Sequence, residues 1–481
     1  MAALAIHDLS VRWQGESLVD ALSLTLEPGR ALTILGESGS GKSLIAQAIM
    51  GILPAQLQAG GDIRVGGHSS RIQDGAARRA LWGSKLALLP QEPWSALDPT
   101  MRVGWQLAET YHQVGQVPRG QAGGRARETL QALGLPHSHD AWPHTLSGGM
   151  GQRVVFALST AGGAPLMLAD EPTKGLDLPL RDDMVMRLQA VLHKGGSVLT
   201  ITHDVSVAQA LGGDVIVLLD GKVVERGRAE KVLQEPSADY TRQLLAAMPE
   251  HWPARKPPAC AGAPLLRLRG VAKQYGGNQL FAGADLDIGA AERLSLWGPS
   301  GSGKSTFGDI ALGIRRPDAG SVRRREDIGP FGLQKLYQNP LMSFAPRRTL
   351  RQSMQDLIRR HALPAAELQE FMQRLRLGQG LLERLPHEVS GGELQRLALA
   401  RVLLLKPALI FADEPTSRLD LISQRNTLEL LIDTAESSGA ALLLVTHDPH
   451  IARALGGRQL RFPWRETQAA EEGVRGPIDR G

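Results

Sequence analysis

The sequence predicts an α/β protein in which one fold occurs twice along the chain, and two observations support this prediction. A glycine-rich octapeptide is repeated, as GESGSGKS at residues 36–43 and GPSGSGKS at residues 298–305. Each copy is then followed, at comparable spacing, by a lone Gln, an SGG tripeptide, an Asp-Glu pair and a His. Because chance does not produce such an ordered series twice, we expect two domains, at residues 1–248 and 265–481.

Composition excludes several classes of protein. The 481 residues can form two domains that each bury a core, and 42% hydrophobic with 21% charged residues is typical of soluble globular proteins. No apolar run reaches the roughly 18–20 residues that cross a bilayer, and the N-terminus does not resemble a secretory signal. The single Cys260 excludes an internal disulfide framework and fits a reducing cytoplasm. Any membrane role would therefore depend on partners.

Charge gives a weak indication of binding partners. The net charge of +5 and the pI near 9.4 permit attraction to anionic lipid headgroups or nucleic acid. The densest basic stretches are Arg315, Arg316 and residues 323–325, and no aromatic residues interleave with them as a base-stacking surface requires. We interpret them as solvated arginines on a surface hairpin, and we expect no nucleic-acid partner.

The strand pattern repeats with the motifs. Each half opens with an alternating segment that predicts an edge strand, and residues 31–35 and 293–297 then form a strand that leads directly into the glycine-rich loop. The segments PLMLADEP and PALIFADEP predict buried strands that end in acidic residues, and SVLTITHD and ALLLVTHD continue the pattern. This arrangement favours a parallel sheet covered by helices.

Two polar, helix-prone stretches interrupt the sheet pattern, at about residues 92–146 and 339–389, and predict inserted helical subdomains. Between the halves, residues 249–264 are rich in proline and small side chains, which predicts an extended linker.

A strand, a glycine-rich loop and a helix in succession form a phosphate-binding site. Glycines let backbone NH groups approach phosphate oxygens, and the helix N-terminus adds partial positive charge. We expect Lys42 and Lys304 to reach the β- and γ-phosphates of ATP, and Ser43 and Ser305 to bind Mg²⁺. The predicted loop residues are Gly36, Glu37, Ser38, Gly39, Ser40, Gly41, Lys42 and Ser43 in the first half, and Gly298, Pro299, Ser300, Gly301, Ser302, Gly303, Lys304, Ser305 and Thr306 in the second.

The acidic pairs follow strands that should end beside these loops. Asp170 and Asp413 are predicted to hold Mg²⁺ through water, and Glu171 and Glu414 to orient and polarise the attacking water. An isolated Asp-Glu pair would be interpreted as a surface turn, but the upstream loop favours the catalytic interpretation.

A His and a Gln complete each predicted site. His203 and His447 lie 32 and 33 residues after the paired glutamates, so we expect them to contact the γ-phosphate, although a lone His after a strand is usually an ordinary structural residue. Gln91 and Gln338 lie where sheet and insert join. There, a Gln can bind Mg²⁺ or water and couple movement of the insert to the site.

The segments LSGGMGQR and VSGGELQR, at residues 146–153 and 389–396, resemble the signature of ATP-binding cassette (ABC) ATPases. The resemblance covers nearly the whole chain and implies P-loop NTPase domains with mixed-sheet cores that hydrolyse ATP. It also implies a head-to-tail sandwich with two composite sites. One would pair the Lys42 loop with Ser390, Gly391 and Gly392, and the other would pair the Lys304 loop with Ser147, Gly148 and Gly149.

The same resemblance assigns four further residues. Asp177 and Asp420 would lie in loops that cross the interface, and Trp13 and Tyr275 would stack on adenine. Taken alone, either ring would be interpreted as edge-strand packing.

Within the family, the chain resembles the two ATPases of dipeptide, oligopeptide and nickel importers, fused into one polypeptide. PSADYTRQLL is similar to one partner and QNPLMSFAPR to the other. This implies a peripheral position on the cytoplasmic face of the inner membrane, two permease subunits docked near residues 93–99 and 340–346, and an extracytoplasmic solute-binding protein. The chain departs from some relatives because one cysteine cannot build an iron–sulfur site, and because its second half lacks a matching tail.

Two alternatives belong to other functional classes. A soluble tandem ATPase acting on ribosomes or nucleic acid would usually join its halves by a long charged helix, whereas this linker is short and Pro-rich. A regulator that binds ATP without hydrolysing it is disfavoured because both halves keep their Glu, His and signature.

Overall fold

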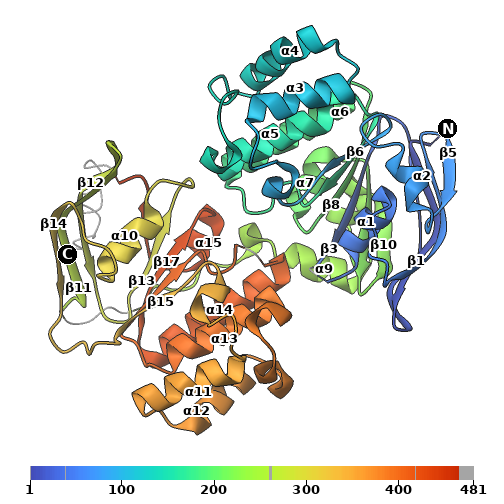
Figure 1. Ribbon diagram of the computed structural model, residues 1–481. Helices are drawn as coiled ribbons and strands as arrows, with labels where there is room; N and C mark the ends of the chain where they lie inside the picture. Colours follow the sequence, from blue (N-terminus) through green and yellow to red (C-terminus); the bar gives the residue numbers. More distant parts are fainter. Residues whose placement is uncertain (1, 38, 259–262, 418, 465–481) are drawn as a thin grey trace, which may run out of the picture. The chain divides into compact units, whose positions relative to one another are not determined.

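The computed structural model describes residues 2–37, 39–258, 263–417 and 419–464. The chain divides into two compact units, Met1–Ala246 and Ala247–Gly481. Each unit combines sheets with helices, which confirms the predicted α/β fold (Figure 1). Ser38, Cys260 and part of the predicted linker lie outside the described residues.

The first unit contains two sheets. Its strands are β1 (Leu4–Trp13), β2 (Glu16–Leu26), β3 (Ala31–Gly36), β4 (Gln58–Val65), β5 (His68–Arg71), β6 (Leu86–Leu89), β7 (Leu166–Asp170), β8 (Ser197–Thr202), β9 (Asp214–Leu219) and β10 (Lys222–Arg228). Its α-helices are α1 (Lys42–Met50), α2 (Gly75–Arg79), α3 (Val103–Gln113), α4 (Arg119–Ala132), α5 (Gly148–Ala161), α6 (Leu178–His193), α7 (Val205–Leu211), α8 (Ala229–Gln234) and α9 (Asp239–Ala246). An antiparallel sheet has the order β2-β1-β4-β5, and the core sheet has the order β10-β9-β3-β8-β7-β6. The core sheet is mixed because β10 pairs antiparallel with β9, while the other neighbours are parallel.

The second unit repeats this plan. Its strands are β11 (Leu266–Tyr275), β12 (Asn278–Ile288), β13 (Arg293–Trp297), β14 (Ala319–Arg324), β15 (Leu333–Leu336), β16 (Leu409–Asp413), β17 (Ala441–Thr446) and β18 (Arg458–Arg461). Its α-helices are α10 (Lys304–Ala311), α11 (Leu350–His361), α12 (Ala365–Arg374), α13 (Gly391–Leu403), α14 (Leu421–Ser438) and α15 (Pro449–Ala454). The antiparallel sheet has the order β12-β11-β14, and the core sheet β15-β16-β17-β13-β18 is parallel throughout its described strands.

The core strands are apolar because both of their faces are covered. All six residues of β3 are buried, and so are all six of β8. Ile34 packs in one cluster with Ile45 and Ile49 of α1 and with Leu4 of the antiparallel sheet. Since β3, β7 and β8 run parallel, their carboxyl ends meet at one edge of the sheet. The residues that follow these strands are therefore brought together there.

Each helical insert packs onto the helix that begins with the SGG motif. In the first unit, Leu107 of α3 and Leu130 of α4 share a cluster with Val154 of α5. In the second, Met354 of α11 and Met372 of α12 share one with Leu397 of α13. Figure 1 shows α3 and α4 beyond α5, away from the sheet that contains β1 and β5.

The described part of the predicted linker packs along the second unit. Trp252 is buried and lies in one pocket with Leu428, Ile432 and Ile451. Arg255 pairs with Asp433 at 2.5 Å. An indole and a salt bridge therefore anchor this segment to the unit that follows it in sequence.

Candidate active sites

The glycine-rich loops connect a buried strand to a helix, as predicted. Gly41 and Gly303 precede α1 and α10 with φ of +92° and +99°, a conformation that favours glycine. A Cβ atom on Gly36 would lie 2.4 Å from the carbonyl oxygen of Leu218, so a side chain cannot be accommodated there. Both loops thus keep their backbone accessible beside a helix N-terminus, which is the arrangement that binds phosphate.

The loop lysines are buried and held by loop carbonyls. Lys42 Nζ donates to the carbonyls of Gly36 and Glu37 at 2.7 and 2.6 Å. Lys304 Nζ donates to Gly298 and Pro299, both at 2.8 Å. In each loop the ammonium charge is therefore kept where phosphate oxygens would bind.

The equivalent serines Ser40 and Ser302 differ between the two loops. Ser40 donates its hydroxyl to the carbonyl of Glu37 at 2.8 Å. Within the described residues, the buried hydroxyl of Ser302 has no hydrogen-bond partner. The exposed hydroxyl-bearing residues Ser43 and Ser305 begin their helices beside Lys42 and Lys304. The remaining residues predicted to bind phosphate lie in the same two loops, except Ser38, which is outside the described residues.

Glu171, the first predicted catalytic glutamate, is tightly held. Glu171 is 7% exposed and follows β7 with a φ of +47°. Its Oε2 lies 2.8 Å from His203 Nδ1 and accepts a hydrogen bond from the Thr202 hydroxyl at 3.2 Å, while Oε1 lies 4.0 Å from Lys42 Nζ. Burial alone would raise the pKa of Glu171, but His203 and the lysines outweigh it and lower that pKa. The carboxylate is therefore charged at neutral pH and fixed in orientation.

Asp170 is the corresponding metal-ligand candidate. Burial, with a contribution from the charge of Glu171, raises the pKa of Asp170 to about 6. Its Oδ1 is buried and accepts no hydrogen bond from the described residues. A buried carboxylate oxygen without a partner is unfavourable unless a cation or donor satisfies it. These residues therefore fit a divalent cation at this position.

The second unit surrounds the equivalent aspartate differently. Asp413 Oδ1 accepts a hydrogen bond from the Ser305 hydroxyl at 2.7 Å, and its Oδ2 lies 3.1 Å from Lys335 Nζ. Lys335 also donates to Asp309 at 2.6 Å. Burial would lower the pKa of Lys335, but the two aspartates outweigh it and raise that pKa. Asp413 is therefore satisfied by a hydroxyl and a buried cation.

The second glutamate is also held by a different set of groups. Glu414 has a φ of +42°, and its Oε1 lies 3.6 Å from His447 Nδ1. Its Oε2 accepts a hydrogen bond from Gln338 at 3.0 Å, and Gln338 also bonds the Ser417 hydroxyl at 3.2 Å. Gln338 therefore contacts the predicted catalytic carboxylate in this unit, whereas Gln91 in the first unit is half-buried where β6 leads into the insert.

The SGG motifs begin helices α5 and α13. Ser147 is the N-cap of α5 and accepts from Met150 NH at 3.4 Å. Ser390 is the N-cap of α13 and forms a reciprocal capping box with Glu393. The glycines that follow them, Gly148, Gly149, Gly391 and Gly392, form the first turns, whose NH groups are free of intrahelical partners. These helix N-termini have the polarity that attracts phosphate.

Of the four residues predicted from resemblance, the two aspartates cap helices and the two aromatic residues are exposed. Asp177 and Asp420 are buried N-caps of α6 and α14. Trp13 and Tyr275 are 45% and 43% exposed, so their rings are accessible. Arg315 and Lys273 lie 5.6 and 5.5 Å from the centre of the Tyr275 ring. Nucleotide contacts by these four remain predictions.

Sequence reasoning missed Lys335, Asp309 and Thr202. Lys335 lies three residues before Gln338, where the first half has Leu88, and Asp309 lies five residues after Lys304, where the first half has Gln47. Aligning the two halves therefore shows a positive and a negative residue in the second half where the first half has uncharged ones, and this difference indicates an ion pair. Thr202 precedes His203 in the repeated T-H-D segment and could have been identified by the same alignment.

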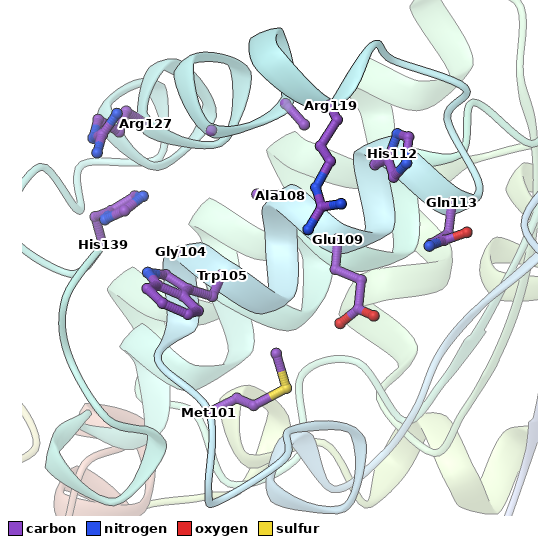
Figure 2. A pocket seen from close by; sticks show the side chains of 12 residues that line it. Met101, Gly104, Trp105, Ala108, Glu109, His112, Gln113, Arg119, Arg127 and His139 are labelled. Carbon is purple, nitrogen blue, oxygen red and sulfur yellow. The ribbon is translucent and has the colours of Figure 1, made fainter.

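The helical insert of the first unit contains a cavity of about 500 Å³. Figure 2 shows that Trp105 and Glu109 on α3 and Arg119 on α4 line it, with Arg119 directed toward Glu109. Trp105 is 63% exposed. This cavity lies in the insert and is lined by none of the predicted ATP-site residues.

No helix in the described part of the chain is long and apolar enough to cross a membrane. The same residues contain no group of three or more His, Cys, Asp or Glu side chains that could hold a metal ion. Ser43 with Asp170, and Ser305 with Asp413, remain the pairs that we predict to hold Mg²⁺ together with nucleotide oxygens.

The fold and loops define nucleotide-hydrolysing domains, and comparisons with known proteins identify the class. The family model described as "ABC transporter" matches residues 19–174 and 281–417. The glutathione import ATP-binding proteins GsiA of Escherichia coli K12 and Shigella sonnei are each 32% identical to the chain, over 95% of this chain and 84% of theirs. The chain belongs to the ABC transporter ATPase family, and its activity is ATP hydrolysis.

Solved structures support the fold alone. A structure titled "RNase-L Inhibitor" matches 95% of this chain and 88% of its own with a TM-score of 0.65 at 20% identity. Archaeal ribosome recycling factor aABCE1, in complex with the stalk protein aP1, matches the same shares with a TM-score of 0.67 at 21% identity. Both likenesses extend along nearly the full length of this chain.

Proposed function

We propose that the chain is the ATP-hydrolysing subunit of an importer that takes up a small peptide or a related solute through a separate permease. The observation that carries this proposal is the 32% identity to glutathione import ATP-binding proteins along 95% of the chain. Nickel and metal–opine complexes remain within the range of substrates that the resemblance implies. The protein would lie on the cytoplasmic face of the inner membrane, beside two permease subunits that receive solute from a binding protein.

The proposed chemistry uses two composite ATP sites. Each glycine-rich loop would bind the phosphates of one ATP, and the SGG helix N-terminus of the other unit would complete the site. Bound Mg²⁺, held by Ser43 and Asp170 or by Ser305 and Asp413, would neutralise charge on the phosphates. Glu171, fixed by His203, would orient the attacking water, and Glu414 would do so in the second unit.

The inserts would dock onto the permease. Their exposed apolar side chains support this, because Trp94 in the 93–99 segment is 42% exposed, and Leu341 and Met342 in the 340–346 segment are 43% and 70% exposed. Exposed apolar side chains gathered on one segment commonly mark interaction sites. ATP binding and hydrolysis would then gate the permease through these contacts.

Affinity purification from cells tests this proposal. We expect the tagged chain, solubilised in mild detergent, to retain two integral membrane proteins, and Trp94→Arg with Met342→Arg to release them without loss of ATP binding. Ile314→Arg is the matched control, because Ile314 is 58% exposed and lies outside both docking segments. Retention of ribosomal proteins instead would favour the alternative of a soluble ATPase acting on ribosomes, which the structural likeness to aABCE1 brings into consideration.

A further inference from the structure

A buried ion-pair network distinguishes the second ATP site from the first. Lys335 Nζ lies 2.6 Å from Asp309 and 3.1 Å from Asp413, and its side chain is 10% exposed. The rings of Tyr337 and Phe411 lie 5.2 and 5.1 Å from the same ammonium group. Strand β15, helix α10 and strand β16 each contribute to this network, so Lys335 is held from three sides.

The first unit has no charges at the equivalent positions. Leu88 replaces Lys335 and Gln47 replaces Asp309. Asp170 is left with a buried Oδ1 that has no hydrogen-bond partner among the described residues. Lys42 and Lys174 act on Asp170 electrostatically, but among the described residues neither forms a salt bridge with it, whereas Lys335 lies 3.1 Å from Asp413. A divalent cation would therefore compete with a directly paired ammonium group only at the second site.

We propose that Lys335 is a positioning residue that holds Asp413 and lowers the Mg²⁺ affinity of the second ATP site relative to the first. A positive charge beside the carboxylate repels a divalent cation and competes for the same oxygen. The negative charge of Asp309 offsets much of this repulsion, so the net effect is far smaller than that of one unpaired charge, and we expect a change in Mg²⁺ affinity of roughly tenfold. The two sites would then fill with Mg²⁺ at different concentrations. This inference rests on the ATP and Mg²⁺ sites of the proposed function and not on import.

The test measures binding of a fluorescent ATP analogue to the full chain over a series of free Mg²⁺ concentrations. Lys42→Ala isolates the second loop, and Lys304→Ala isolates the first. The readout is the Mg²⁺ midpoint, the concentration at which nucleotide affinity has risen halfway. We expect a midpoint about tenfold higher at the second site. Equal midpoints would overturn the proposal.

Three variants separate an electrostatic role from a merely structural one. Lys335→Leu with Asp309→Gln recreates the pair of the first unit, and should lower the midpoint of the second site about tenfold. Asp309→Asn leaves Lys335 with Asp413 alone, and should raise the midpoint further. The reciprocal change, Leu88→Lys with Gln47→Asp, should raise the midpoint of the first site. If Lys335 had only a structural role, the double variant and Asp309→Asn would shift the Mg²⁺ midpoint of the second site in the same direction. That result would also overturn the proposal.

The control removes an ion pair elsewhere in the same unit. Lys406 lies 2.8 Å from Glu367, and Lys406→Gln with Glu367→Gln should leave the midpoint unchanged. Failure of both isolated loops to bind nucleotide would overturn the site assignment together with this inference. Loss of permease association alone would contradict only the import proposal.

Discussion

The two units carry the same motifs but surround the aspartates that we propose as metal ligands differently. Asp170 is buried with an oxygen that has no hydrogen-bond partner in the described residues, and its pKa is raised to about 6. Asp413 contacts Ser305 and Lys335. The glutamates differ as well, with His203 at 2.8 Å from Glu171 and His447 at 3.6 Å from Glu414. Identical motif residues can therefore have different electrostatic surroundings, and around Asp413 these depend on Lys335 and Asp309, which are distant from it in sequence.

Removal of both water-orienting carboxylates should have the largest effect. We expect Glu171→Gln with Glu414→Gln to slow steady-state phosphate release by at least about 100-fold. ATP binding should be retained, because Gln preserves the size of each side chain. The two single variants would sharpen the comparison, since unequal residual rates would show that the sites turn over unequally. Unchanged hydrolysis in the double variant would refute the catalytic assignment.

Replacing one loop lysine by alanine should weaken ATP binding at one of the two sites only. Lys42→Ala removes a charge-assisted contact to phosphate, and we expect ATP affinity at that site to fall about 10–100-fold. Lys304 keeps its own loop contacts, so equilibrium dialysis should count one tightly bound ATP per chain. Lys304→Ala should give the reciprocal result. A chain that loses both ATP molecules, or neither, would contradict independent loops.

Replacing Asp170 or Asp413 by Asn should change the free energy of unfolding of the metal-free protein in opposite directions. The pKa of Asp170 is about 6 in the folded state against an ordinary 3.8, so the folded state binds more protons between these values. The free energy of unfolding therefore falls as pH rises through that window, and the loss is complete above it. We expect Asp170→Asn to raise this free energy by about 3 kcal/mol at pH 7.5.

Asp413→Asn should instead lower the free energy of unfolding of the second unit by about 1–3 kcal/mol, because Lys335 loses one of its two carboxylate partners. Differential scanning calorimetry with a chelator present measures both changes. Shifts of the same sign would contradict the electrostatic difference between the units.

The smallest expected difference concerns the SGG helices. Ser390 has a capping box with Glu393, whereas Ser147 makes one cap hydrogen bond at 3.4 Å. We expect Ser390→Ala to destabilise its unit by about 1 kcal/mol, and Ser147→Ala to have less effect. Chemical denaturation followed by circular dichroism measures this. A larger effect from Ser147→Ala would show that the two caps contribute differently from what their geometry indicates.

The fold could be predicted because its signals are local and repeated. The strands before Gly36 and Gly298 and those that end in Asp170 and Asp413 all form where the apolar runs indicated. The convergence of these residues follows from the parallel order of the strands, which needs no side-chain detail.

The surroundings of the site could not be predicted in the same way. The Lys335 network depends on contacts between three elements that are distant in sequence, and Gln338 reaches Glu414 only through the path of the chain after β15. The packing of Trp252 against the second unit could not be predicted either. The prolines of its segment indicate an extended backbone, but they do not indicate which residues that backbone contacts. Motifs specify which groups are present, whereas tertiary packing determines how each is paired.

Both glutamates that we propose to orient the attacking water have a left-handed backbone, with φ of +47° at Glu171 and +42° at Glu414. For a residue other than glycine, this conformation is less favourable than the right-handed one by about 1 kcal/mol or more. Glycine at either position should therefore give an inactive protein whose backbone is more relaxed than that of the alanine variant. At these two positions, the residue that favours the folded state differs from the residue that favours ATP turnover. A homologue under no selection for ATP hydrolysis would therefore gain stability by replacing either glutamate with glycine.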